Sequence, residues 1–139
     1  MRIHIAVTGT MMGQAAANRA ASLLHDAIAT RGEAGLILAT GASQFGMLEN
    51  LVRAPVAWSR VTVYHLDEYI GLAETHPASF RRYLRERFVS RVPELRAFVP
   101  VNGDTGDPRA ECDRLGRLIG DACIDVACIG IGENGHLAF

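Results

Sequence analysis

Gly35-Leu36-Ile37-Leu38-Ala39-Thr40-Gly41 is the stretch of sequence that decides the fold. Its first five residues form a short apolar run, which predicts a buried strand, and Thr40-Gly41 closes that strand. Before it, apolar residues recur at helical spacing over residues 13–30, and Gly32 ends this helix in the usual C-terminal way. Residues 44–53 are expected to form a second helix. The segment therefore predicts a strand enclosed between two helices.

The same alternation continues along the rest of the chain. We expect strands at residues 2–7, 60–66, 97–101 and 124–131, and helices at residues 78–89 and 108–119. The run 124–131 is nearly all apolar, as in a central strand covered on both faces. Thr10 is expected to cap the first helix. This order predicts a doubly wound α/β fold, with a mostly parallel sheet and helices on both faces, in a single domain of residues 1–139.

Composition narrows the class of protein. The chain has 139 residues, of which 49% are hydrophobic, so it can bury the core of one domain. Its apolar runs are far shorter than the roughly 18 residues that a membrane span needs, which argues against an integral membrane protein. The net charge is −1, without the basic excess of a nucleic-acid binder. We interpret one group of arginines as a solvated helix face: Arg81, Arg82, Arg85, Arg87 and Arg91.

Two residue types limit the chemistry. All 14 basic residues are arginine, so no lysine side chain can supply a Schiff-base amine. The three cysteines include no Cys-x-x-Cys pair, so neither a disulfide scaffold nor a zinc site is expected. The first residues lack the long apolar core of a signal peptide. These features favour a protein of the reducing cytoplasm that binds no metal.

Three loops follow predicted strands and begin near Thr40, Asp67 and Gly132. In a parallel sheet the carboxyl ends of the strands meet at one edge, where ligands bind. The first loop, residues 39–44, offers a glycine for a sharp turn, the hydroxyls of Thr40 and Ser43, and backbone N–H groups that attract an anion. A phosphate ligand is one interpretation. The other is a plain strand–helix turn with Ser43 as the N-cap.

Two adjacent acids open the second loop, Leu66-Asp67-Glu68-Tyr69-Ile70-Gly71-Leu72. Successive side chains diverge, so we expect one carboxylate to enter the cleft and the other to point away from it. A carboxylate at the end of a strand can serve as a base for a carbon acid next to a carbonyl group. The alternative is that both acids cap or solvate the loop.

The third loop, Gly130-Ile131-Gly132-Glu133-Asn134-Gly135-His136, is rich in glycine and ends in a histidine. An imidazole can transfer a proton near neutral pH. The alternative is a structural histidine that bonds a backbone carbonyl group. Asp67 and His136 can form an acid–base pair across one cleft. Together with a phosphate loop, such a pair suits proton shuttling on a sugar phosphate.

These motifs resemble those of the glucosamine-6-phosphate deaminase family, within the wider group that includes 6-phosphogluconolactonase. The resembling segments are residues 39–43, 66–72, 76–80, 110–112 and 130–139, in the family's order and over nearly the whole chain. The Asp-Glu-Tyr-x-Gly-Leu block followed by His-Pro-x-Ser-Phe is specific to the deaminase branch. The Gly-x-Gly-x-x-Gly-His block is shared with the lactonases. The resemblance implies a doubly wound α/β fold.

The resemblance also implies an activity: conversion of glucosamine 6-phosphate and water to fructose 6-phosphate and ammonia, without a cofactor or metal. It makes Asp67 the base that moves a proton between C2 and C1 of the opened sugar, and His136 the group that helps to open the ring. It places a loop around the 6-phosphate, formed by Thr40, Gly41, Ala42 and Ser43. It adds further residues that bind the substrate or support its loop: Glu68, Glu133 and Gly135. Family members assemble in different ways, so a homo-oligomer is compatible with the resemblance.

Two features depart from the family pattern. The deaminases carry an aspartate two residues before the histidine, where this chain has Asn134. An amide can orient His136 for ring opening, but it cannot stabilise an imidazolium as a carboxylate does. The family runs to roughly twice this length, on the usual size of full doubly wound domains. We therefore expect an N-terminal portion, with the acidic partner of the histidine and a phosphate-binding lysine beyond Phe139. A 6-phosphogluconolactonase-like hydrolase and a non-catalytic sugar-phosphate-binding module are the alternatives.

Overall fold

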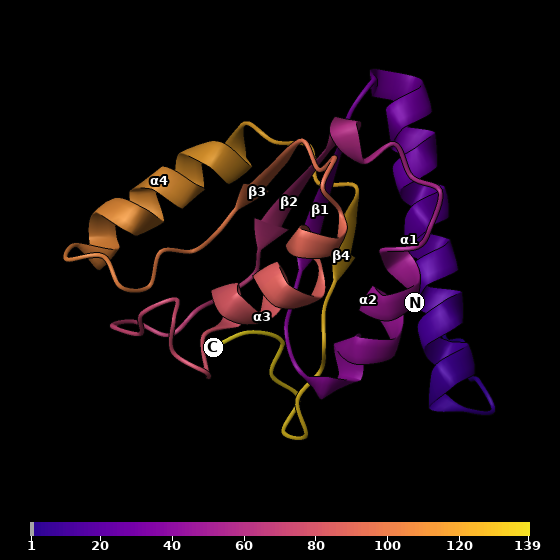
Figure 1. The fold of residues 1–139 in the computed structure, drawn as a ribbon, viewed down its shortest axis with the longest axis horizontal. Helices are drawn as coiled ribbons and strands as arrows, with labels where there is room; N and C mark the ends of the chain where they lie inside the picture. The colour runs from indigo at the N-terminus through magenta and orange to yellow at the C-terminus, as the bar shows by residue number, and fades with distance from the viewer. Residues whose placement is uncertain (1) are drawn as a thin grey trace.

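Four short strands form one sheet in the order β3-β2-β1-β4. Their bounds are β1 Ala34–Leu38, β2 Val61–His65, β3 Ala97–Val99 and β4 Val126–Cys128. Figure 1 shows this sheet in the computed structural model, which describes residues 2–139. All neighbouring strands are parallel, and Leu36 of β1 lies between Val63 of β2 and Val126 of β4. The predicted α/β fold with a parallel sheet is confirmed.

The strand order reverses at β1. β2 and β3 lie on one side of β1, and β4 lies on the other. In a parallel sheet, the chain can leave one strand toward one side and the neighbouring strand toward the other side. The loops at the carboxyl ends of these two strands then separate and leave a crevice. The fold thus places a crevice beside the carboxyl end of β1, between the loops that follow β1 and β4.

Residues 2–139 contain four α-helices: α1 Gly9–Arg31, α2 Phe45–Leu51, α3 Phe80–Arg87 and α4 Pro108–Gly120. α1 precedes β1, and the other three connect consecutive strands. Short 3₁₀ turns span Ala42–Gln44, Trp58–Arg60 and Val89–Arg91. Within the same residues, no helix is both long enough and apolar enough to cross a membrane.

The N-terminus of α1 differs from the expected one. Its cap is Thr8, in an extended conformation, and the hydroxyl of Thr8 accepts the backbone N–H of Met11 at 3.2 Å. The prediction of Thr10 as the cap is wrong. An N-cap residue has extended backbone angles and precedes the helix, whereas Thr10 lies inside the first helical turn. Gly32 ends the helix as expected, with φ at 81°.

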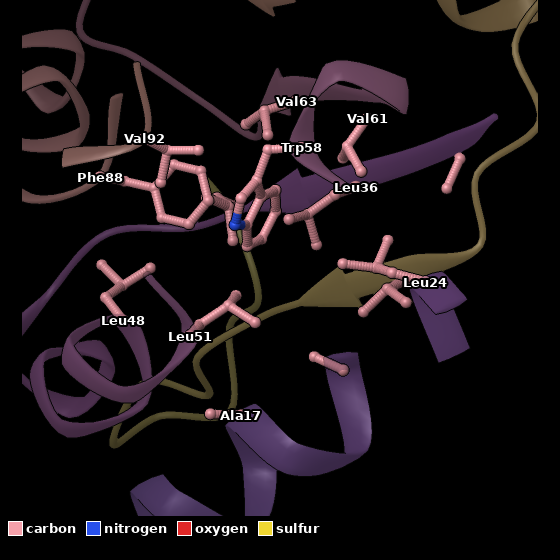
Figure 2. Packing of buried hydrophobic residues seen from close by; sticks show 14 of the residues in the cluster. Ala17, Leu24, Leu36, Leu48, Leu51, Trp58, Val61, Val63, Phe88 and Val92 are labelled. Carbon is pink, nitrogen blue, oxygen red and sulfur yellow. The ribbon is translucent and has the colours of Figure 1, made fainter. Parts of the chain in front are cut away.

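The core lies between one face of the sheet and the helices α1, α2 and α3. Trp58 and Phe88 meet edge to face, with ring centroids 5.3 Å apart and planes at 84° (Figure 2). The aliphatic side chains of the same core come from α1, β1, α2 and β2 and are almost fully buried: Leu24, Leu36, Leu48, Leu51, Val61 and Val63. This packing fixes α2 and α3 against the sheet, next to the carboxyl ends of its strands.

The opposite face of the sheet carries Thr62 and Tyr64, which alternate with the core residues of β2. These two side chains and Leu118 of α4 line a cavity of about 270 Å³. The C-terminal part of α4 therefore lies over this face. Helices therefore lie on both sides of the sheet, as the sequence predicted, although Leu118 of α4 remains 40% exposed.

The strand expected at residues 2–7 is not formed. These residues have no regular structure, and Ile3, Ile5 and Val7 are 72%, 93% and 89% exposed. Their alternation indicates β-propensity, but a strand forms only where a neighbour supplies partners for its backbone N–H and C=O groups. No strand within residues 2–139 pairs with this segment.

The expected central strand at residues 124–131 is also wrong in length and place. β4 has three residues and lies at an edge of the described sheet, where it pairs with β1. Ala127 is exposed, and Ile131 is 77% exposed. A continuous apolar run predicts a strand that is covered on both faces and has a neighbouring strand on each side. Within residues 2–139, β4 has a neighbour on one side only, and part of the segment is exposed.

Candidate active site

A cavity of about 180 Å³ opens at the carboxyl ends of β1, β2 and β4. Thr40 and Ser43 line it from the loop after β1, Asp67 from the loop after β2, and His136 from the loop after β4. The rest of its wall is mainly apolar and is formed by Ala39, Leu66, Phe80, Gly130, Ile131, Gly132, Leu137, Ala138 and Phe139. The structure thus brings together the three loops that the sequence placed at one edge of the sheet.

The other expected site residues lie outside this wall: Gly41, Ala42, Glu68, Glu133, Asn134 and Gly135. Several of them still shape the cavity, because they contact its lining residues or hold the loops that carry them. Glu133 is exposed, and its carboxylate makes no ion pair within residues 2–139.

The first loop turns at Gly41, whose φ of 109° and ψ of 164° strongly favour glycine. The carbonyl oxygen of Gly41 accepts two hydrogen bonds, from the backbone N–H of Gln44 at 3.1 Å and from the hydroxyl of Tyr83 at 2.9 Å. Ser43 does not cap α2, because it lies inside the 3₁₀ turn that precedes this helix. Its hydroxyl is instead part of the cavity wall.

Asp67 is the half-buried acid of the second loop. Burial raises the pKa of its carboxyl group above the ordinary value. A backbone hydrogen bond from Phe139 and the nearby His136 lower this pKa, but burial, together with the negative charge of Glu68, outweighs them. A carboxylate with a raised pKa holds a proton more strongly, which suits a base that takes a proton and returns it.

Glu68 points away from the cavity, as the divergence of neighbouring side chains predicts. Its carboxylate is buried and accepts the hydroxyl of Ser79 at 2.8 Å and the backbone N–H groups of Tyr69, Phe80 and Arg81 at 3.0, 3.1 and 2.8 Å. Burial alone would raise the pKa of Glu68, but these donors outweigh burial and lower it. Glu68 therefore binds the first turn of α3.

Arg81 completes this buried cluster. Its Nε lies 3.4 Å from Glu68 Oε2, its Nη1 donates to Asp104 at 2.9 Å, and its Nη2 donates to the carbonyl group of Leu72 at 2.9 Å. Arg81 is 4% exposed, so its assignment to a solvated face is wrong. The helix turns this residue toward the Asp67 loop, where two carboxylates and a carbonyl group compensate its charge.

The third loop holds His136 through its own turn. The backbone N–H of Gly132 donates to the carbonyl group of His136 at 2.8 Å, and the Nδ1 of the ring lies 2.5 Å from Asn134 Oδ1. Since an amide oxygen only accepts, Nδ1 carries the proton and Nε2 is a proton acceptor in the neutral ring. A Cβ on Gly132 would lie 2.1 Å from a ring carbon of His136, so only glycine leaves room for the ring.

An aromatic cluster forms one side of the cavity. The rings of Phe80 and Phe139 are stacked at 5.6 Å, and Tyr69 lies 4.7 Å from Phe139. These contacts join the end of the third loop to α3 and to the Asp67 loop. Phe80 and Phe139 line the cavity together with the half-buried Asp67.

Chemically, the cavity combines a carboxylate, an imidazole with a free acceptor nitrogen, and two hydroxyl groups. This set can move protons on a small polar ligand. No group of three or more His, Cys, Asp or Glu side chains within residues 2–139 is arranged to hold a metal ion.

Residues 8–138 match the family described as glucosamine-6-phosphate isomerases/6-phosphogluconolactonase. The chain belongs to this family. The match includes all three loops of the cavity.

Curated relatives of the family are named glucosamine-6-phosphate deaminase. The protein of Exiguobacterium sp. strain AT1b is 38% identical over 118 residues, which are 85% of this chain and 46% of the relative. The protein of Lactobacillus delbrueckii subsp. bulgaricus is 30% identical over 139 residues, which are 100% of this chain and 57% of the relative. The chain thus spans about half the length of the curated relatives it matches.

Solved structures of both branches share the fold. A monomeric glucosamine-6-phosphate deaminase matches with a TM-score of 0.82 and 30% identity, over 99% of this chain and 58% of its own. A 6-phosphogluconolactonase from Shewanella baltica OS155 matches with a TM-score of 0.82 and 25% identity, over 93% of this chain and 56% of its own. The fold is therefore common to the two branches, and the site residues must distinguish them.

Sequence reasoning missed two contacts that shape the site. Tyr83 lies within the helix expected at residues 78–89, and nothing in the sequence connects it with Gly41. Arg81 was grouped with exposed arginines. Both contacts join segments that are distant along the chain, so local periodicity carries no signal for them.

Proposed function

We propose that the chain forms part of a deaminase that converts glucosamine 6-phosphate and water to fructose 6-phosphate and ammonia. One observation carries the proposal: Asp67, with its raised pKa, shares a small cavity with His136 and with the hydroxyls of Thr40 and Ser43. The names of the curated relatives support it.

Three steps use these residues. Nε2 of His136 takes the proton of the C1 hydroxyl and delivers it to the ring oxygen as the bond between C1 and that oxygen breaks, so the sugar opens and C1 becomes an aldehyde. Asp67 takes the proton from C2 and returns it to C1, while a second proton passes from the amine nitrogen to the C1 oxygen. These transfers convert the open-chain amino aldose to a ketose imine at C2. Water then adds to this imine and ammonia leaves, which gives fructose 6-phosphate.

The phosphate is assigned to the first loop. Thr40 and Ser43 offer hydroxyl groups, and the backbone N–H groups of residues 41–43 add donors around the turn at Gly41. Holding the phosphate here leaves the sugar to extend toward Asp67 and His136. The reacting carbons are then close to the acid–base pair.

A lactonase-like hydrolase is the second candidate. The Shewanella baltica structure favours it, since its fold matches as well as that of the deaminase. Opening of a lactone requires water and a general base, but no proton transfer between C2 and C1. Asp67 is therefore the residue that separates the two candidates.

The test is to assay ammonia and fructose 6-phosphate in parallel, with glucosamine 6-phosphate as substrate. We expect both products in equal amounts, and Asp67→Asn should lower kcat by about 10²–10⁴-fold while the substrate still binds. Asp113→Asn, an exposed carboxylate of α4, is the matched control and should have normal kcat.

The outcomes are distinct. Full activity of Asp67→Asn contradicts the role of this base. Hydrolysis of a 6-phosphosugar lactone without ammonia release supports the lactonase. Binding of the sugar phosphate without turnover supports a non-catalytic module.

A further inference from the structure

Helix α3 contacts two of the three site loops. At its N-terminus, the backbone N–H groups of Phe80 and Arg81 bind the carboxylate of Glu68, next to Asp67. One turn later, the hydroxyl of Tyr83 donates to the carbonyl oxygen of Gly41 at 2.9 Å. The same helix therefore holds both the proposed base loop and the proposed phosphate loop.

The hydrogen bond from the hydroxyl of Tyr83 restrains the peptide group of Gly41, a residue with an intrinsically flexible backbone. Gly41 has a φ of 109° and lies in a region where glycine is free to move between several conformations. Its carbonyl oxygen has two donors, the N–H of Gln44 from within the turn and the hydroxyl of Tyr83 from outside it. Tyr83 is thus the side chain that ties this turn to another element.

The direction of the Gly41 carbonyl group determines the direction of the N–H group of Ala42, which belongs to the same peptide group. The peptide group is planar and trans, so the C=O of Gly41 and the N–H of Ala42 point in opposite directions. Since Tyr83 holds the carbonyl toward α3, the N–H of Ala42 is turned away from α3. This N–H is one of the donors assigned to the phosphate.

The ring of Tyr83 is itself fixed. It stacks on Phe45, the first residue of α2, with centroids 5.8 Å apart and planes at 20°. The guanidinium of Arg87 lies 4.0 Å from the centroid of Phe45 and 5.2 Å from that of Tyr83. Burial raises the pKa of Tyr83 to about 12, so the hydroxyl keeps the proton that it donates. A rigid ring can hold a loop in a way that a flexible side chain cannot.

We propose that Tyr83 is a positioning residue for the phosphate-binding loop: its hydroxyl fixes the Gly41 peptide and thereby the donors of residues 41–43. The inference rests on the proposed function, because it assigns the phosphate to this loop. Tyr83 does not line the cavity and has no part in the chemistry. Its loss should therefore weaken binding of the phosphate and leave the proton transfers unchanged.

The test is Tyr83→Phe in the full chain, which removes the hydroxyl and keeps the stack on Phe45. The matched control is Tyr64→Phe, whose ring lies over the far face of the sheet, beside the cavity at the amino ends of the strands. Affinity is measured by calorimetry with inorganic phosphate and with glucosamine 6-phosphate, and kcat and KM are measured separately. The order of residues 41–43 without ligand is followed by ¹⁵N relaxation.

We expect Tyr83→Phe to raise Kd for both ligands, and KM, by about three- to tenfold, the usual effect of one lost hydrogen bond. kcat should stay within about twofold. Relaxation should show increased motion of residues 41–43 in the ligand-free variant. Tyr64→Phe should match the wild type in all of these measurements.

Unchanged affinity in Tyr83→Phe, with or without a change in loop motion, overturns the inference. So does a fall in kcat at constant KM, because Tyr83 would then act on the reacting atoms. If the wild-type chain binds neither ligand, the proposed function fails first, and the positioning role fails with it. If the wild type binds both and the variant is unaltered, the inference about Tyr83 alone is wrong.

Discussion

Asn134 Oδ1 lies 2.5 Å from Nδ1 of His136, two residues further along the same loop. The amide orients the imidazole and fixes its tautomer, because it accepts the Nδ1 proton. It carries no charge, so it gives little help to an imidazolium. A histidine that opens a sugar ring needs a fixed orientation and a partner that stabilises its imidazolium form. The contact with Asn134 supplies the orientation but not the stabilising charge.

Replacement of Asn134 separates these two needs. Asn134→Ala removes the acceptor, and we expect kcat for glucosamine 6-phosphate to fall by about tenfold with little change in KM. Asn134→Asp keeps the acceptor and adds a charge, so kcat should be at least as high as in the wild type. Steady-state kinetics measure both. Equal kcat in the wild type and Asn134→Ala would show that the amide has no orienting role.

The close approach of His136 to Gly132 gives a second expectation. A Cβ at residue 132 would lie 2.1 Å from the ring, so Gly132→Ala should displace the imidazole from the cavity and lower kcat by about tenfold or more. Gly116→Ala is the control, since a Cβ there meets no atom within 4 Å. That change lies in the interior of α4 and should stabilise the fold by about 0.5–1 kcal/mol. Normal activity in Gly132→Ala would contradict this account of the third loop.

The raised pKa of Asp67 predicts the acid side of the pH profile. The base must be ionised to take a proton, so kcat/KM should fall as pH decreases through a value above 3.8, the ordinary pKa of this group. The profile of kcat/KM against pH for the wild type measures it. An acidic limb at or below 3.8 would mean that another group is the base.

Ionisation of Asp67 should have opposite effects on activity and on the stability of the fold: it is required for activity, but it destabilises the folded chain. Because its pKa is raised in the folded protein, the folded chain binds more protons than the unfolded chain between 3.8, the ordinary pKa, and the folded pKa, so stability falls as pH rises through this range. Asp67→Asn should therefore raise Tm at pH 7, although it lowers kcat. The gain in Tm should vanish below pH 3.8, where the carboxyl group is protonated in both states. A lower Tm at pH 7 would refute this linkage.

Glu68 should behave as a structural acid. Its carboxylate satisfies backbone donors of α3 and lies beside buried Arg81, so Glu68→Gln should cost about 3 kcal/mol in the free energy of unfolding at pH 7. Its pKa is lowered by folding, so the stabilisation is present above 4.5 and is lost as pH falls below this value. Urea unfolding at several pH values measures the effect. Glu94→Gln, at an exposed position, is the control, and an equal loss of stability in both variants would argue against the cluster.

Much of the molecule could be predicted from its sequence. The buried run at residues 35–39 and the helical spacing before it predicted β1 and α1, because short-range periodicity determines which face of an element is apolar. Loops after parallel strands must lie at one edge, so the meeting of Thr40, Asp67 and His136 could also be anticipated. The paired acids, Asp67 and Glu68, diverge as neighbouring side chains do.

The tertiary structure decided which of these elements find partners. Residues 2–7 alternate as a strand does, yet they remain exposed because no described strand lies beside them. Arg81 looks like one more surface arginine, yet it is buried because Glu68 and Asp104 face it. The bond from Tyr83 to Gly41 joins positions 42 residues apart. Sequence by itself determined local conformation and the types of residue at the site, since these depend on near neighbours. Burial, pairing and the positions of the loops depend on contacts between distant segments, and only the folded chain settles those.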